Sequence, residues 1–141
     1  MEVRTSRWFR RERSAVPSAR AFVAHALRSA GAPGQVVDAL VLAVAEACNN
    51  AVLHAGGTAV TLTVSVEDGR ATVTIADDGV GFDPPRHPTM PAPLALGHRG
   101  LALMDALVDR VDVSSGAAGT TVALVQSLGA GVPPAGVVAD A

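Results

Sequence analysis

Three polar side chains lie in a mostly apolar stretch, at a spacing that would let them act on one ligand. The stretch QVVDALVLAVAEACNNAVLH, residues 35–54, carries Glu46, Asn50 and His54 at intervals of four residues. In a helix this spacing places all three on one face, one turn apart. A carboxylate can accept a proton from a hydroxyl or water, and an amide oxygen can bind Mg²⁺. Because polar groups among apolar ones are costly to bury alone, we expect these side chains to have partners.

A second cluster, DDGVG at residues 77–81, follows a stretch that alternates in the manner of a strand. Asp77, at the end of that strand, can accept a hydrogen bond from the exocyclic amine of a base. Gly79 and Gly81 let the backbone turn close to a ligand without a Cβ clash. The alternative is an ordinary Asp-Asp-Gly turn, and Asp78 is interpreted as no more than part of such a turn.

A third cluster, GHRGL at residues 97–101, opens a predicted helix. Gly97 and Gly100 would bring backbone N–H groups and the positive end of that helix to phosphates. The chain contains no lysine, which excludes a Walker-type phosphate loop and a protein-kinase cleft built around a lysine. Arg99 is therefore the expected cation at this end. Together the three clusters predict a pocket for a magnesium nucleotide.

Structural alternatives stay open for the helix residues. Glu46 could pair with an arginine such as Arg20 or Arg28, and Asn50 could bridge backbone groups. His54 could serve only as a cation at the negative end of the helix dipole.

Hydrophobic periodicity predicts the elements that must position these clusters. Helices are expected from about Pro17 to Ala30, over residues 35–54, and from about Arg99 to Arg110. Strands are expected over residues 2–10, 58–67, 70–77, 111–115 and 120–128, with a hairpin turn at 68–69. The Gly- and Pro-rich stretch 78–97 is expected to be a functional or mobile loop. This order predicts an α+β two-layer sandwich, with helices on one face of a largely antiparallel sheet.

Length and composition bound the class of protein. The 141 residues suit one domain, predicted at 1–128, with a disordered tail at 129–141. No run is expected to span a membrane, since the longest, Ala39–Ala45, ends at Glu46, and the polar start shows no secretory signal. A cytoplasmic location is the expectation. The single cysteine, Cys48, allows no internal disulfide and no cysteine zinc cluster, and it is expected in the core.

Charge is unevenly distributed along the chain. Residues 1–20 hold six arginines and two acids, whereas the remainder holds five arginines and eleven acids. The basic segment could meet an acidic protein surface or nucleic acid, and a solvated edge strand with charged gatekeepers is the simpler interpretation. Direct nucleic-acid binding is not expected, because aromatic residues make up 3% of the chain and do not interleave with a basic patch.

The three clusters in this order, followed by Gly119-Thr120 before the last strand, resemble the Bergerat-fold ATPases of the GHKL group. The segments EACNNAVLHA, TIADDGVGFDP, GHRGLALMDALVDRV and GTTVAL are most similar to the small anti-sigma-factor serine kinases of the RsbW type. The resemblance covers roughly residues 15–127. It implies the Bergerat ATP-binding fold, a two-layer α+β sandwich.

The resemblance also implies a role for each matching residue. Glu46 would be the general base or would position water, and Asn50 would hold Mg²⁺. Asp77 would bind the adenine amine, Thr120 would support the adenine end, and residues 83–98 would form the ATP lid. The residues expected to bind ATP are Asn50, Asp77, Gly79, Gly81, Gly97, Arg99, Gly100, Leu101 and Thr120. Leu101 also fits a core position.

Proteins of this type dimerise, bind a sigma factor, and phosphorylate a serine or threonine of an anti-anti-sigma factor (STAS-type) partner. The resemblance therefore implies an ATP- and Mg²⁺-dependent protein serine/threonine kinase that is also an anti-sigma factor and a homodimer. It implies no direct contact with nucleic acid or membrane. The alternative is a non-catalytic ATP-binding module that sequesters a protein partner.

Overall fold

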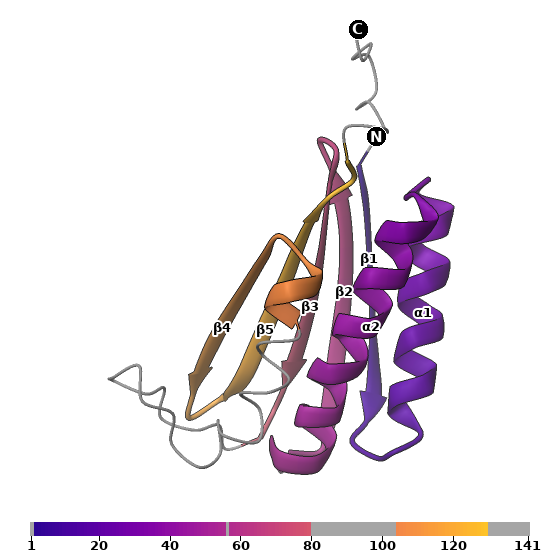
Figure 1. Cartoon of the computed structure of the whole chain (residues 1–141). Coiled ribbons are helices and arrows are strands. Elements are labelled where there is room, and N and C mark those ends of the chain that lie inside the picture. Colours follow the sequence, from indigo (N-terminus) through magenta and orange to yellow (C-terminus); the bar gives the residue numbers. More distant parts are fainter. Residues whose placement is uncertain (1, 56, 80–103, 130–141) are drawn as a thin grey trace, which may run out of the picture.

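The computed structural model describes residues 2–55, 57–79 and 104–129 of the chain. The predicted lid at 83–98 and the predicted tail beyond Gly129 lie outside these residues. The strands are β1 (Val3–Arg10), β2 (Ala59–Glu67), β3 (Arg70–Asp77), β4 (Arg110–Gly116) and β5 (Gly119–Ser127), as labelled in Figure 1. The helices are α1 (Ala15–Ser29), α2 (Gly34–Asn50) and the π-helix η1 (Ala51–Ala55), with a further helical turn at 104–107.

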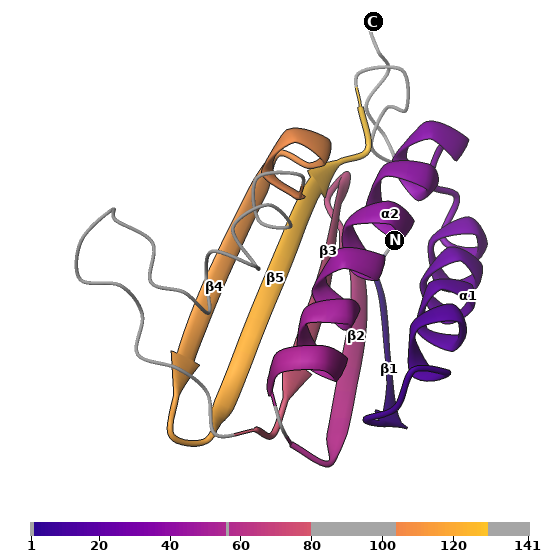
Figure 2. The ribbon, with the colours of Figure 1, turned by 60° about the horizontal axis from the view of Figure 1, so that its bottom comes forward.

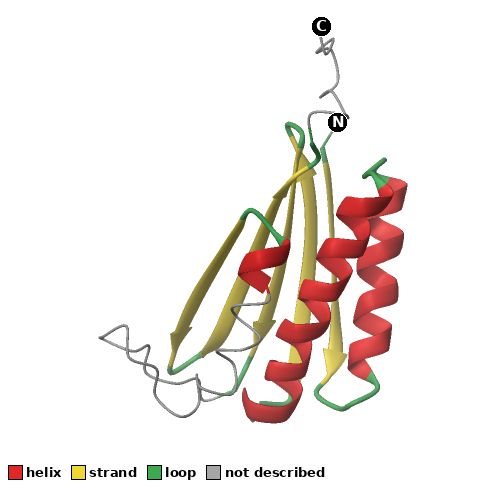
Figure 3. Ribbon diagram, viewed as in Figure 1, coloured by secondary structure: helices red, strands yellow, loops and turns green. Residues whose placement is uncertain are grey.

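The strands form one five-stranded sheet in the order β1-β2-β3-β5-β4, and every neighbouring pair is antiparallel. α1 and α2 lie side by side on one face of this sheet, as Figures 1 and 2 show from two directions. No described helix covers the opposite face (Figure 3). The predicted α+β two-layer sandwich with a largely antiparallel sheet is therefore confirmed.

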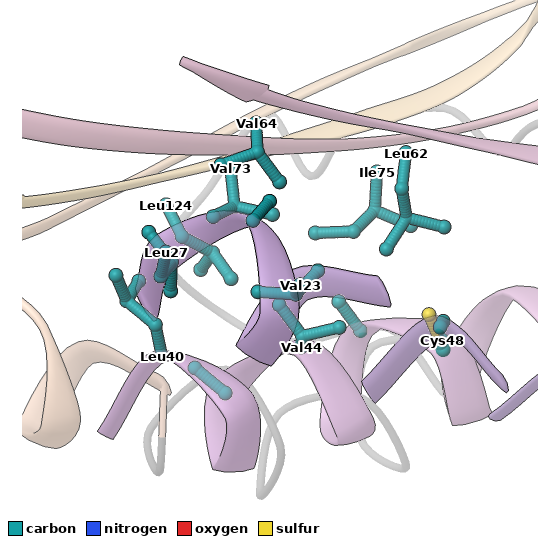
Figure 4. Close-up of a cluster of buried hydrophobic side chains, with 14 of the residues drawn as sticks. Val23, Leu27, Leu40, Val44, Cys48, Leu62, Val64, Val73, Ile75 and Leu124 are labelled. Atoms are coloured by element: carbon teal, nitrogen blue, oxygen red, sulfur yellow. The ribbon is translucent and has the colours of Figure 1, made fainter. Parts of the chain in front are cut away.

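Alternation along the strands turns one row of apolar side chains from each central strand toward the helices. Leu62 pairs with Ile75, Val64 pairs with Val73, and Val73 also pairs with Leu124. The helix residues that face this row include Val23, Leu27, Leu40, Val44 and Cys48 (Figure 4). A shift of one residue would turn the whole row to the solvent face, so burial fixes the register of the sheet.

α2 is apolar on most sides because it packs against both the sheet and α1. Cys48 lies in this packing, and burial raises the pKa of its thiol to about 12. A thiol with this pKa stays protonated at neutral pH and is a poor nucleophile. The predicted core position of Cys48 is confirmed.

The expectation about membrane spans needs one correction, which concerns the length and composition of α2 only. By length and composition, the segment Gly34–Leu53 is apolar enough to cross a membrane, with a mean hydropathy of 1.7. Half of this segment is buried inside the structure, against the sheet and α1. A core helix passes the same test of length and composition, so the finding is weak evidence for a membrane span.

The predicted third helix ends too late. The described helical turn ends at residue 107, and Arg110 already pairs with Val125 as the first residue of β4. Asp109, which the predicted helix would include, instead bonds the chain to β5. Its backbone N–H donates to Gln126 Oε1 (3.0 Å), and its Oδ2 accepts from the Ser127 N–H (2.8 Å). These bonds satisfy the backbone where the helix gives way to the strand.

Leu40 and Leu42 of α2 offer a matched test of this packing, since Leu40 is fully buried and Leu42 is 47% exposed. We expect Leu40→Ala to lower the free energy of unfolding by about 2–5 kcal/mol, because it leaves a cavity between α2 and the sheet. Leu42→Ala should change it by less than about 0.5 kcal/mol. Urea denaturation measures both. Equal effects would contradict the described orientation of α2.

Candidate functional site

Glu46 and Asn50 lie one turn apart near the end of α2, and both are half-buried. Neither makes a hydrogen bond or an ion pair with a described residue. Arg20 and Arg28, which could have paired with Glu46, are exposed on α1 and form no ion pair with it. The pairing of Glu46 with Arg20 or Arg28 is therefore not formed, and no described residue bonds to the side-chain oxygen atoms of Glu46 or Asn50.

The helix predicted over residues 35–54 does not stay α-helical to its end. Its last turn is η1, in which the backbone hydrogen bonds are widened to the π pattern. Such turns are rare and occur frequently at functional sites. Glu46 and Asn50 precede this turn and keep the spacing of an α-helix. The side chain of His54 lies outside the described part of the chain, so its role stays a prediction.

Asp77 is the last residue of β3, on the face of the sheet that carries the helices. Its Oδ1 accepts hydrogen bonds from the backbone N–H groups of Gly79 (2.9 Å) and Thr120 (3.3 Å). Its Oδ2 accepts none from a described residue. One oxygen is thus fixed by the protein, and the other is left to accept a hydrogen bond from a ligand amine.

Thr120 lies opposite Asp77 in the ladder between β3 and β5. Its side chain is buried, and its hydroxyl oxygen is 2.8 Å from that of Ser115 on β4. The backbone of Thr120 therefore holds Asp77, while its side chain is bonded to the neighbouring strand. The structure thus places Thr120 next to Asp77, and its role at the adenine end stays a prediction.

Two glycines, one before β2 and one at the start of β5, lie very close to residues 77–79. A Cβ at Gly57, before β2, would lie 2.2 Å from Asp78 Oδ1 and 2.5 Å from the Gly79 nitrogen. A Cβ at Gly119, which has φ +130°, would lie 2.0 Å from the Asp77 carbonyl oxygen. Only glycine permits both approaches. Residues 77–79 are thus closely packed between Gly57, which precedes β2, and Gly119 of β5.

The interpretation of Asp78 as an ordinary turn residue is wrong. Its Oδ1 accepts from the backbone N–H groups of Thr58 (2.7 Å) and Ala59 (2.9 Å), and its Oδ2 accepts from Thr58 Oγ1 (2.6 Å). These bonds to Ala59 and Thr58 lower the pKa of the Asp78 carboxyl from 3.8 to about 2. The carboxylate of Asp78 therefore fastens the end of β3 to the start of β2.

Arg11, which follows β1, was also missed. Its guanidinium donates from Nε to the Gly57 carbonyl and from Nη1 to the Val52 carbonyl of η1 (2.5 Å). Its backbone N–H donates to the Thr58 carbonyl (2.9 Å). Sequence reasoning had no signal for this residue, because six arginines stand in the first 20 positions and all look alike.

The sheet brings part of the predicted site to one end of the molecule. The last turn of α2, the end of β3 and the start of β5 lie together at the lower end of Figure 1. The predicted site residues that the structure describes there are Glu46, Asn50, Asp77, Gly79 and Thr120. The other predicted residues, Gly81, Gly97, Arg99, Gly100 and Leu101, lie outside the described part and stay predictions.

The donor set suits a metal that is bound together with phosphates. Among residues 2–55, 57–79 and 104–129, no group of three or more His, Cys, Asp or Glu side chains could hold a metal ion. Mg²⁺ in a nucleotide complex takes one or two protein oxygens, with phosphates and water completing its shell. The unpaired amide of Asn50 fits that requirement.

Comparison with protein families identifies the domain. The model of the histidine kinase-like ATPase domain matches residues 9–126. The chain belongs to this family. The match confirms the resemblance to the GHKL ATPases, and it implies ATP as the ligand of a histidine kinase-like ATPase domain.

Solved structures share the fold of this histidine kinase-like ATPase domain. The crystal structure of the RsbU and RsbW domains of Rv1364c from Mycobacterium tuberculosis matches with a TM-score of 0.69 at 22% identity, over 89% of this chain and 32% of that chain. The histidine kinase domain of the Erythrobacter litoralis EL346 blue-light activated histidine kinase matches with a TM-score of 0.52 at 22% identity, over 80% of this chain and 61% of that one. This chain thus spans about a third of the first protein and 61% of the second. No curated protein matches.

The hydrogen bonds of Asp78 predict a pH dependence of stability. The pKa of Asp78 is about 2 in the folded protein, below its ordinary value of 3.8. Ionised Asp78 therefore stabilises the fold above about pH 4, and this contribution is lost as the pH falls toward 2. We expect Asp78→Asn to flatten the fall of unfolding free energy between pH 5 and pH 2, measured with urea. The control Asp38→Asn, an exposed change on α2, should keep the wild-type slope. Identical slopes for all three proteins would contradict the role of Asp78.

Proposed function

We propose that this protein is an ATP-binding anti-sigma factor and a protein serine/threonine kinase, which phosphorylates an anti-anti-sigma partner. The observation that carries the proposal is the end of the sheet where the last residue of β3, Asp77, and the end of α2 lie on the same side of the molecule. There one aspartate oxygen is fixed and the other has no described partner, and the nearby helix end presents Glu46 and Asn50 unpaired. Membership of the histidine kinase-like ATPase family supports ATP as the ligand. The fold shared with a protein that contains an RsbW domain supports the partner-switching context.

The described residues divide the binding of ATP between them. Asp77 Oδ2 accepts from the exocyclic amine of adenine, and the buried Gly79 leaves room for the ring. Asn50 is the protein ligand of Mg²⁺, which when bound offsets the negative charge of the phosphates. The predicted residues Gly97, Arg99, Gly100 and Leu101 complete the phosphate end, with Gly81 beneath the base.

Glu46 is the base of the proposed transfer. It takes the proton from a serine or threonine hydroxyl of the partner as that oxygen attacks the γ-phosphorus of ATP. The bond between this phosphorus and the bridging oxygen to the β-phosphate breaks, so the phosphoryl group moves to the partner and ADP leaves. Glu46 has no partner among the described residues, which supports this role because its oxygen atoms are not already bonded there.

β1 offers a surface for the proposed partners. It is an edge strand, as the sequence predicted, and Arg4, Trp8 and Arg10 alternate away from the buried Phe9. Trp8 is 65% exposed, and neither arginine forms an ion pair with a described residue. We propose a sigma factor and a STAS-type anti-anti-sigma factor as partners, a homodimer as the assembly, and the cytoplasm as the location. Direct contact with nucleic acid or membrane is not part of the proposal.

Glu46→Gln tests the kinase. We expect this variant to bind ATP with Mg²⁺ nearly as the wild type does, because the shape of the side chain is kept. Transfer of labelled phosphate to an anti-anti-sigma domain should fall by about 10²–10⁴-fold, the usual contribution of a general base. Asp38→Asn, an exposed change on the same helix, is the matched control and should transfer at the wild-type rate.

The outcomes separate the two functions. If the wild type binds ATP but transfers no label, and Glu46→Gln still sequesters the partner, the protein is the non-catalytic ATP-binding module. If neither ATP nor ADP raises the melting temperature of the wild type in Mg²⁺, the nucleotide site itself is refuted.

A further inference from the structure

Directly after Asp77, the backbone of β3 is only weakly bonded to β2. The ladder between β2 and β3 ends at the pair of Val60 and Asp77. The next backbone contact, from the Asp78 N–H to the Ala59 carbonyl, is long at 3.4 Å. The three hydrogen bonds that the Asp78 side chain accepts are shorter, at 2.6–2.9 Å. Beyond Asp77, the side chain of Asp78 therefore holds the chain to β2 more firmly than the backbone contact does.

The same turn is connected to the end of α2 by Arg11. The Asp78 carboxylate accepts hydrogen bonds from Thr58, and the carbonyl of the adjacent Gly57 accepts one from the Arg11 guanidinium. The same guanidinium also donates a hydrogen bond to the Val52 carbonyl of η1, the turn that follows Asn50. We call the group of Arg11, Gly57, Thr58 and Asp78 the Asp78 clasp. It joins the β1 end, the β2 start, the β3 end and the α2 end by direct hydrogen bonds.

We propose that Asp78 and Arg11 are positioning residues for base recognition: the Asp78 clasp sets where Asp77 Oδ2 stands relative to the nucleotide base. The inference rests on the proposed ATP site and names residues that act on it indirectly. Neither side chain has to touch the nucleotide.

The geometry around Asp77 gives the physical reason. Asp77 Oδ1 is committed to the Gly79 and Thr120 N–H groups, so Oδ2 has little freedom to search for the amine. Its position follows the backbone of residues 77–79, which the clasp holds from the β2 side. Hydrogen bonds weaken steeply with misalignment, so a small shift of this backbone weakens recognition of the amine before it weakens contacts elsewhere.

Discrimination between ATP and inosine triphosphate (ITP) is the test, because it reports on the amine alone. ITP carries a carbonyl where ATP carries the amine, so a carboxylate oxygen at that position favours ATP strongly. We expect Asp78→Ala to lower the ratio of the ITP Kd to the ATP Kd by about tenfold, the worth of one well-placed hydrogen bond. Arg11→Ala should lower it by about threefold, since it removes only the outer part of the clasp. Calorimetric titration with Mg²⁺ measures both constants.

Matched variants separate positioning from general loss of structure. Arg13→Ala and Asp112→Ala remove exposed side chains outside the clasp and should keep the wild-type ratio. Asp78→Asn keeps an oxygen for the Thr58 and Ala59 N–H groups, and its amide can donate to the Thr58 hydroxyl. It should therefore restore the ratio to within about threefold of the wild type. If Asp78→Ala does not fold, Thr58→Val, which removes one bond of the clasp, takes its place.

The results distinguish this inference from the proposed function. Failure of the wild type to bind ATP refutes the site as a whole. A wild type that binds ATP and ITP equally, or variants that fold and keep the wild-type ratio, overturns the inference while ATP binding stands. A lowered ratio in Asp78→Ala and Arg11→Ala, with unchanged controls and recovery in Asp78→Asn, supports it.

Discussion

The close approach of three backbone segments at residues 77–79 is the constraint on which the candidate site depends. Gly57 on one side and Gly119 on the other leave no room for a Cβ, at distances of 2.2 Å to Asp78 Oδ1 and 2.0 Å to the Asp77 carbonyl oxygen. The Asp78 carboxylate is hydrogen-bonded and the Asp77 carbonyl belongs to a strand, so moving either group away would break bonds or disturb the sheet. The carboxylate of Asp77 is consequently placed by the meeting of β2, β3 and β5, and not by its own rotamer alone.

α2 serves the core and the site at once. Its buried residues, among them Leu40 and Val44, pack under the sheet, and this burial supplies much of the apolar area that stabilises the fold. Near its end the same helix carries the half-buried Glu46 and Asn50, neither of which has a partner among the described residues. Polar side chains in an otherwise apolar helix add little to the packing, so the end of α2 where η1 begins departs from the pattern that stabilises the rest of the helix. The rest of the helix is apolar enough to resemble a membrane span by composition.

Most of the fold could be predicted because its signals are local. Alternation marked β2 and β3, and Asp68-Gly69 marked their turn, with the strand ends right to within one or two residues. Asp77 could be singled out because a strand end followed by glycine is visible in one dimension. The role of Asp78 could not, because its partners Thr58 and Ala59 lie about twenty positions earlier and become neighbours only through the pairing of β2 with β3. The change from α- to π-helix at Ala51 likewise has no sequence periodicity of its own.

Arg11 shows why the composition of residues 1–20 did not reveal a structural role for any single arginine in that segment. Counted with its neighbours, it belongs to a basic edge, and Arg4 and Arg10 do lie exposed on β1. One residue beyond the strand, however, the chain turns, and Arg11 donates to the Val52 carbonyl in the last helical turn and to the Gly57 carbonyl that follows it. A guanidinium suits this place because its fork of N–H groups can reach two carbonyls at once. The strand with the exposed arginines is therefore connected by hydrogen bonds, through Gly57, Thr58 and Asp78, to the segment that carries Asp77.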